Sequence, residues 1–115
     1  MTRIWYIETG ESMELLAKGH AETTEDGRES MVCAGISALT QTLMESVMRE
    51  TEEGWIRAEG DMPGRGELWI RAWPGEEHRE RIRDRFRFVM TGLEEIRKAY
   101  PGKIEIEEVI MNGDL

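Results

Sequence analysis

The chain has 115 residues, of which 39% are hydrophobic and 34% are charged. This length predicts one domain over residues 1–115 with a single core, because two cores need a longer chain. The formal net charge of −9 argues against a nucleic-acid-binding protein, since affinity for phosphate backbones comes mainly from Lys and Arg.

The composition also bears on partners, compartment and cofactors. An acidic balance is compatible with a basic peptide or protein as substrate, although solubility alone is the favoured explanation. No apolar run approaches the roughly 20 residues that cross a bilayer, and the N-terminal segment lacks the apolar core of a signal peptide. One cysteine cannot form an internal disulfide, which fits a reducing cytoplasm. One cysteine with two distant histidines is a poor ligand set, so we expect no zinc site and no cofactor.

The first part of the chain predicts a β-hairpin. Residues 3–7 are rich in β-forming side chains, and a turn cluster follows at residues 9–12. A second strand over residues 13–21 would bring His20 to the end of the sheet. Gly19 would permit a bend or a close backbone approach there, although it could also be an ordinary irregularity of the strand.

A helix is predicted from residue 30 to between residues 50 and 54. Apolar residues follow Ser30 at roughly helical spacing, namely Met31, Ile36, Leu39, Leu43 and Val47. Ser30 is the expected N-cap, which puts Cys33 in the first helical turn. Unpaired amides and the positive end of the helix dipole there favour thiolate over thiol. The amides of Cys33 and Ala34 could also stabilise an oxyanion.

Cys33 and His20 are the candidate nucleophile and base, since a thiol and an imidazole are the minimum for a thiolate nucleophile. The stretch from residue 22 to Ser30 holds no large apolar side chain. It should therefore cross the surface and could close over a bound peptide. Ser37 lies one turn after Cys33 and could hydrogen-bond near the sulfur. Each of the three residues also has a competing structural interpretation. Cys33 could be a small buried hydrophobic residue, and His20 a polar residue whose hydrogen bonds are made within the fold. Ser37 could be a small residue that the helix tolerates for packing.

A second hairpin is predicted over residues 55–59 and 67–73, because turn residues separate two alternating segments. The expected core face holds Ile56, Ala58, Leu68, Ile70 and Ala72. The other face holds Trp55, Arg57, Trp69, Arg71 and Trp73. This strip of tryptophan and arginine predicts a homodimer interface or a peptide groove, unless it is simply an exposed sheet face.

A long helix over residues 76–99 and a last strand over residues 103–109 complete the chain. The helix has an apolar stripe that should pack on the sheet, formed by Ile82, Phe86, Val89, Leu93, Ile96 and Tyr100. Arg79, Arg83 and Arg87 alternate with acids and indicate a solvated mixed-charge face rather than an anion site. His78 has no evident partner. The order β-β-α-β-β-α-β predicts an α+β fold with two helices on one face of a small sheet.

Several of these motifs resemble one protease family, the ribosomal-processing cysteine protease (Prp) family. The similarity lies in Gly19-His20-Ala21, a polar loop containing Gly27, Val32-Cys33-Ala34-Gly35 and Ser37-Ala38-Leu39. Near the C-terminus, the family's last helix is similar to Met90-Thr91-Gly92-Leu93, Ile96 and Tyr100-Pro101. The resemblance covers most of the chain and implies a homodimeric cysteine endopeptidase.

The resemblance implies that Cys33 is the nucleophile and His20 its partner. The family usually has an aspartate three residues before the cysteine, where this sequence has Ser30, preceded by Glu29. Serine can replace aspartate as an N-cap, but not as a charge that orients the histidine. Either Glu29 supplies that charge or the protein works with a dyad alone. The candidate substrate-loop residues are Gly19, Glu22, Thr23, Thr24 and Gly27.

The substrate class also follows from the resemblance. Prp proteases remove a short N-terminal extension from the large-ribosomal-subunit protein that borders the peptidyl-transferase centre, and they cut after a hydrophobic segment that contains Phe. Related members process phage capsid or scaffold proteins, and nothing in the sequence separates the two roles. The rival hypothesis is a non-catalytic dimeric interaction module with a degenerate site, which the missing aspartate supports.

Overall fold

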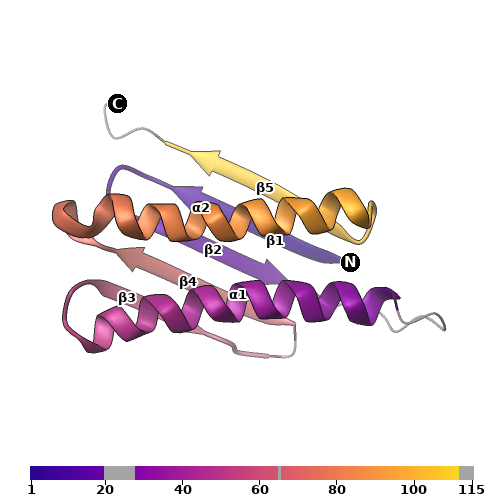
Figure 1. Ribbon diagram of the computed structural model, residues 1–115, viewed down its shortest axis with the longest axis horizontal. Helices are drawn as coiled ribbons and strands as arrows, with labels where there is room; N and C mark the ends of the chain where they lie inside the picture. Colours follow the sequence, from indigo (N-terminus) through magenta and orange to yellow (C-terminus); the bar gives the residue numbers. More distant parts are fainter. Residues whose placement is uncertain (20–27, 65, 112–115) are drawn as a thin grey trace.

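The described part of the chain folds into a five-stranded sheet with two helices on one face (Figure 1). The structure is a computed structural model that describes residues 1–19, 28–64 and 66–111, with the backbone alone for residues 28–30. The elements are β1 (Thr2–Glu8), β2 (Met13–Lys18), α1 (Arg28–Glu52), β3 (Arg57–Asp61), β4 (Glu67–Trp73), α2 (Gly75–Ala99) and β5 (Ile104–Ile110). This confirms the predicted order β-β-α-β-β-α-β.

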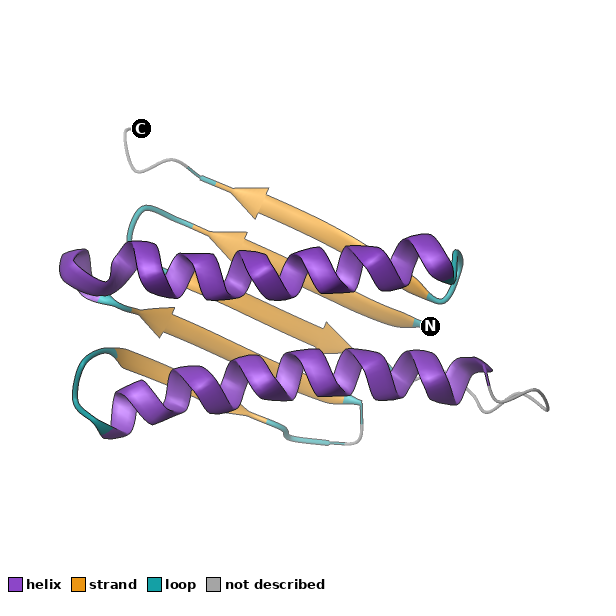
Figure 2. Ribbon diagram, viewed as in Figure 1, coloured by secondary structure: helices purple, strands orange, loops and turns teal. Residues whose placement is uncertain are grey.

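The sheet order is β3-β4-β2-β1-β5. Neighbouring strands are antiparallel except β5, which runs parallel to β1. Tyr6 pairs with Leu15, which pairs with Ile70, so alternate side chains of these strands point to the same face. Both helices cross that face, and none of the described residues forms a helix on the opposite face (Figure 2).

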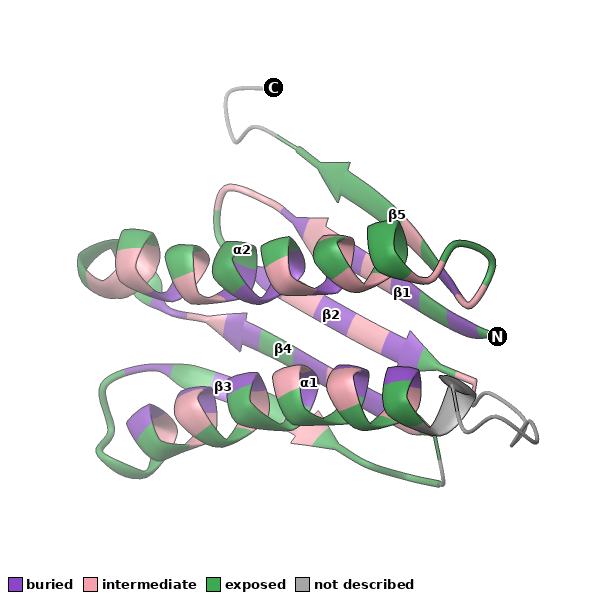
Figure 3. Ribbon diagram, turned by 45° about the vertical axis from the view of Figure 1, so that its right-hand side comes forward, coloured by how far each residue is buried: buried purple, intermediate pink, exposed green. Residues whose placement is uncertain are grey.

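The core lies between this face and the helices. The predicted core face of the second hairpin is confirmed, since Ile56, Ala58, Leu68, Ile70 and Ala72 are all buried. Phe86 of α2 is buried and stacks on Tyr6, with ring centroids 6.0 Å apart. Figure 3 shows that the buried positions of both helices gather on their inner sides. The stripe predicted for α1 is wrong at Met31, which is 62% exposed, while its neighbour Val32 is buried.

The two helices approach closely at one glycine from each. A side chain at Gly35 of α1 would come within 3.1 Å of Ile96 Cδ1, and one at Gly92 of α2 within 3.0 Å of Leu39 Cδ1. These glycines belong to the two motifs, Val32–Gly35 and Met90–Leu93, on which the family resemblance was based. The helix contact therefore fixes the part of α1 that carries Cys33.

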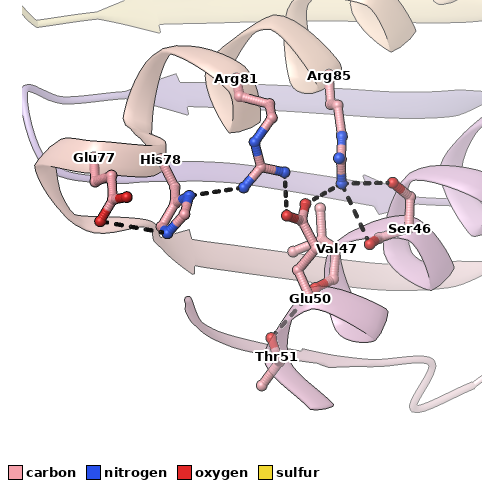
Figure 4. Close-up of polar contacts among 8 residues, drawn as sticks. All are labelled: Ser46, Val47, Glu50, Thr51, Glu77, His78, Arg81 and Arg85. Atoms are coloured by element: carbon pink, nitrogen blue, oxygen red, sulfur yellow. Dashed lines mark hydrogen bonds and ion pairs between the residues drawn. The ribbon is translucent and has the colours of Figure 1, made fainter. Parts of the chain in front are cut away.

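At the other end of α1, a buried carboxylate links the helices (Figure 4). Glu50 accepts hydrogen bonds from Arg81 and Arg85 of α2, and Arg85 also donates to Ser46 Oγ over 3.0 Å. His78, for which the sequence suggested no partner, lies with Nδ1 2.9 Å from a guanidinium nitrogen of Arg81. A buried carboxylate needs such partners, because an unpaired buried charge is strongly destabilising.

A second buried carboxylate, Glu8, links α2 to the end of β1. The guanidinium of Arg87 donates to both carboxylate oxygens over 2.9 and 2.6 Å, and the hydroxyl of Tyr6 donates over 2.7 Å. Arg83 Nε lies 3.7 Å from the same group. The solvated mixed-charge face predicted for these arginines is therefore wrong for Arg83, whose side chain is 27% exposed, but it is confirmed for Arg87, which is 51% exposed while it pairs with Glu8. The buried Nε of Arg79 has no hydrogen-bond partner among the described residues.

This environment changes the titration of Glu8 and Tyr6. Burial by itself raises the pKa of Glu8, but hydrogen bonds from Arg87 and Tyr6 and the charges of Arg87 and Arg83 outweigh it. The pKa of Glu8 therefore lies below its ordinary value. Burial, followed by the hydrogen bond to Glu8, raises the pKa of Tyr6 well above its usual range.

One segment of α1, Met31–Glu52, is long and apolar enough to cross a bilayer by length and composition alone. The expectation that no such run exists is therefore wrong by that measure. A helix that belongs to the core of a globular domain passes the same test. In this fold, the segment contributes Val32, Ile36, Leu43 and Val47 to the core.

Candidate active site

The candidate site lies at the end of the sheet where β2 stops and α1 begins (Figure 1). Lys18, the last residue of β2, pairs with Glu67 at the start of β4 and with Arg3 of β1. The first turns of α1 extend past the ends of β2 and β4 on this side of the molecule (Figure 2). The backbone before residue 20 and the backbone after residue 27 therefore belong to the same end of the molecule.

Gly19 has a conformation that a side chain would not tolerate. Its φ is +102°, and a Cβ added there would lie 2.4 Å from the carbonyl oxygen of Met1. Thr2 Oγ1 also donates to the Gly19 carbonyl over 3.5 Å. Of the two interpretations of this glycine, the close backbone approach is confirmed. The strand ends at Lys18 rather than at residue 21, because Gly19 leaves the extended conformation directly before His20.

The helix that carries Cys33 begins earlier than predicted. It starts at Arg28, so Ser30 is its third residue rather than its N-cap, and Cys33 lies in its second turn. Arg and Glu are good helix formers, so residues 28 and 29 extend the helix toward the N-terminus. The predictions of Ser30 as N-cap and of Cys33 in the first turn are therefore wrong.

The earlier start changes the chemistry available to Cys33. Within a helix that begins at Arg28, the amides of Cys33 and Ala34 donate to carbonyls four residues back, so they are not available to an oxyanion as expected. The unpaired amides belong to the first turn, up to Ser30. The dipole effect is strongest in that turn as well, so Cys33 lies outside the part of the helix where it acts most strongly.

Cys33 is nevertheless not a fully buried hydrophobe. Its side chain is partly buried, between the buried Val32 and the exposed Ala34. Ser37, one turn later, is exposed. The thiol therefore lies at the border between the core-facing side of α1 and its outer side, where a reagent or substrate can approach.

A groove beside α1 was not predicted from the sequence. It has a volume of about 620 Å³ and runs along the helix from Ser37 to Arg49, with Met62 from the β3–β4 connection on its other side. The signals that could have indicated it are Met62 in a turn segment and small or polar residues following Ser37 at helical spacing.

Several predicted site residues lie outside the described residues. These are His20, Glu22, Thr23, Thr24 and Gly27, and of Glu29 and Ser30 only the backbone is described. The structure therefore does not test the dyad geometry or the closing of the loop over a peptide. Among the side chains that are described, no three His, Cys, Asp or Glu residues are placed to hold a metal ion.

Comparison with known families shows to which family the chain belongs. A family model described as cysteine protease Prp matches residues 1–105. The chain belongs to the Prp family of cysteine proteases. This confirms the resemblance in the motifs around Cys33 and Gly92, and it makes the chain a member of a family of cysteine proteases, which are peptide hydrolases.

Solved Prp structures share the fold. An essential ribosomal processing protease Prp from S. aureus, in complex with a covalently linked product peptide, has a TM-score of 0.70 and 22% identity, over 94% of this chain and 99% of that chain. The same enzyme in complex with a substrate peptide has a TM-score of 0.68 and 19% identity, over 94% of this chain and 99% of that chain. SMU.848 from Streptococcus mutans has a TM-score of 0.63 and 20% identity, over 97% of this chain and 98% of that chain. No curated protein matches the chain.

Proposed function

We propose that this Prp-family protein is an endopeptidase in which Cys33 is the nucleophile and His20 is the general base. One observation carries the proposal: the chain belongs to a family of cysteine proteases and contains a single cysteine. That cysteine is partly accessible in α1. His20 directly follows Gly19, whose constrained backbone ends β2 at the same end of the sheet.

The reaction proceeds through a thioester. His20 takes the proton of the Cys33 thiol, and the thiolate attacks the carbonyl carbon of the scissile bond to give a tetrahedral oxyanion. The oxyanion collapses, the C–N bond breaks, and His20 returns the proton to the departing amine. His20 then deprotonates a water molecule, which attacks the thioester and releases the new carboxylate and the thiol.

The first-turn amides of α1 are the candidates for oxyanion stabilisation, in place of those of Cys33 and Ala34. In a helix the Cα–Cβ bond tilts toward the N-terminus, so the Cys33 side chain leans toward the turn that ends at Ser30. Backbone amides there are unpaired within the helix. Glu29 or Ser30, both in this turn, could orient His20. A greater loss of activity in Glu29→Gln than in Ser30→Ala would assign that role to Glu29.

The proposed substrate is the N-terminal extension of the large-ribosomal-subunit protein that borders the peptidyl-transferase centre. Its support is the likeness to S. aureus structures described as a ribosomal processing protease with substrate and product peptides. The alternative substrate is a phage capsid or scaffold protein. Offering both precursors to the purified protein separates the two, because the preferred one is cleaved with the higher kcat/KM.

The activated thiol can be tested without a substrate. We expect iodoacetamide to alkylate Cys33 at neutral pH faster than it alkylates an ordinary cysteine, because a neighbouring imidazole favours the reactive thiolate. His20→Ala should slow this reaction. Slow alkylation that His20→Ala does not change would favour the non-catalytic interaction module instead.

We also propose that the chain forms a homodimer through the face of the sheet that carries no helix. Trp5, Leu16 and Trp69 are neighbours across three strands of this face, and all three are only partly buried. Tryptophan in such a patch is typical of interfaces. The guanidiniums of Arg57 and Arg71 stack over the Trp73 ring, with Cζ atoms 4.1 and 5.2 Å from its centroid, next to this patch.

Light scattering with size-exclusion chromatography tests the dimer. Trp69→Ala should shift the mass from dimer toward monomer. Phe88→Ala is the matched control, since Phe88 is 79% exposed on α2 and lies away from the open face. A wild-type monomer, or a dimer that Trp69→Ala leaves unchanged, would remove this proposal.

A further inference from the structure

We propose that the groove beside α1 binds the substrate peptide on one side of the scissile bond, with Met44 and Met62 as apolar contacts. The inference rests on the proposed protease function, because the groove begins at Ser37, one turn beyond Cys33. From Ser37 to Arg49 the helix rises about 18 Å at 1.5 Å per residue. This length suits about five extended residues.

Helical spacing places Cys33 on the flank that borders this groove. Ser37 and Met44 follow Cys33 by four and eleven residues, which are close to one and three whole turns. Met44 faces β3, because a side chain at Gly60 would lie 3.2 Å from Met44 Cε. The opposite flank packs on α2 through Gly35. The flank with the thiol is therefore turned away from α2 and toward the β3–β4 connection.

Met62 forms the outer wall and is held in place by its neighbours. Its backbone amide donates to Asp61 Oδ1 over 2.8 Å. The following residue, Pro63, restricts Met62 to an extended backbone conformation. The side chain is nevertheless 49% exposed. An unbranched thioether on a fixed backbone can adapt to apolar side chains of different shape.

The rest of the groove favours an uncharged segment. Gln41 and Thr42 are exposed polar residues that can hydrogen-bond to an extended peptide backbone. The charged residues, Glu45 and Arg49, lie toward the far end and pair with each other over 3.4 Å. Their charges offset one another, so the groove attracts neither acidic nor basic residues. Its occupant is therefore an extended apolar segment of the substrate, and not a basic one.

Steady-state kinetics on a fluorogenic peptide with the sequence of the ribosomal-protein extension test the groove. Met62→Glu should raise KM by roughly tenfold with kcat unchanged, because it removes a contact made equally in the ground and transition states. Met111→Glu is the matched control. Met111 is 46% exposed, against 49% for Met62, and follows β5 at the other edge of the sheet. A KM for Met62→Glu equal to that of Met111→Glu would overturn the proposal.

A labelling experiment gives a readout that does not need catalysis. In Cys33→Ala protein, a single cysteine is introduced as Met62→Cys or Met111→Cys, and its rate of reaction with a maleimide dye is measured with and without the same peptide. The peptide should slow labelling at position 62 and leave position 111 unchanged. If fluorescence anisotropy shows that the peptide binds but position 62 stays unprotected, the groove is wrong and the protease function stands. If the peptide does not bind at all, the proposed substrate and the groove both fall.

Discussion

Replacing Gly19 with alanine should destabilise the fold and disturb the candidate site together. Its φ of +102° is unfavourable for any residue with a Cβ. The new methyl group would also lie 2.4 Å from the Met1 carbonyl oxygen, which belongs to the backbone and cannot rotate away. Positive φ costs about 1–3 kcal/mol, and with the contact we expect a loss of about 3 kcal/mol in the free energy of unfolding.

The variant Gly102→Ala separates the cost of the positive φ from the cost of the close contact with Met1. Gly102 also has a positive φ, +87°, but none of the described atoms lies within 4 Å of a Cβ built there. This variant should lose only about 1 kcal/mol, which is the cost of the backbone conformation alone. The difference between the two variants then measures the close approach between Gly19 and Met1.

Urea and thermal unfolding, followed by circular dichroism, measure both losses. The loss expected for Gly19→Ala lowers Tm by roughly 10 °C, and the variant should still fold at 25 °C because domains of this size have about 5–15 kcal/mol of stability. Alkylation of Cys33 should also slow in Gly19→Ala, since the backbone before His20 would move. Equal losses in Gly19→Ala and Gly102→Ala would refute the reasoning.

Two further predictions concern the buried carboxylates. Glu8→Gln should lower the free energy of unfolding by about 2 kcal/mol at pH 7, because it removes the charge that Arg87 binds. The pKa of Glu8 is lowered in the folded state, so its stabilisation is complete above the unfolded pKa of about 4.3 and is lost as the pH falls through the folded value. The difference in the free energy of unfolding between wild type and Glu8→Gln, measured by urea unfolding, should therefore become smaller toward pH 3. A difference that stays constant with pH would argue against a lowered pKa of Glu8. Glu50→Ala should lower the free energy of unfolding by about 2 kcal/mol, since it removes charge-assisted hydrogen bonds while Arg81 and Arg85 stay 39% and 34% exposed to water. A loss below about 1 kcal/mol, typical of surface pairs, would show that the cluster is not stabilising.

The sequence predicted the elements whose signals are local. Alternation and helical spacing identified both hairpins and both helices, because each pattern is complete within a few residues. The start of α1 was missed, since Arg28 and Glu29 favour a helix as readily as Ser30 caps one. Element boundaries depend on such small differences in free energy.

The long-range contacts could not be predicted in this way. Glu8 and Arg87 are 79 residues apart, and only the pairing of α2 with the end of β1 brings them together. An acid and an arginine at that separation look like two surface residues in the sequence. The contact between Gly35 and Ile96 could not be predicted either, because the two residues lie on different helices. This contact explains why the Cys33 motif contains a glycine.

The candidate site was predicted from the family resemblance of its motifs rather than from helical spacing or strand alternation. Helical spacing left Cys33 open to an ordinary packing role, and the motif resemblance, confirmed by the family match, made it the candidate nucleophile. The groove from Ser37 to Met62 joins residues of a helix and of a turn, and its existence depends on how β3 packs beside α1. The local signals, Met62 in a turn segment and small or polar residues after Ser37, do not report that packing.

The most direct test of the central claim is to incubate the purified protein with the ribosomal-protein precursor and to follow the products by intact mass spectrometry. We predict one cleavage that removes the N-terminal extension. Cys33→Ala and His20→Ala should retain the circular dichroism spectrum of the wild type and reduce the rate by at least about a thousandfold. Cleavage that persists in Cys33→Ala, or a wild-type protein that leaves the precursor intact, would contradict the account.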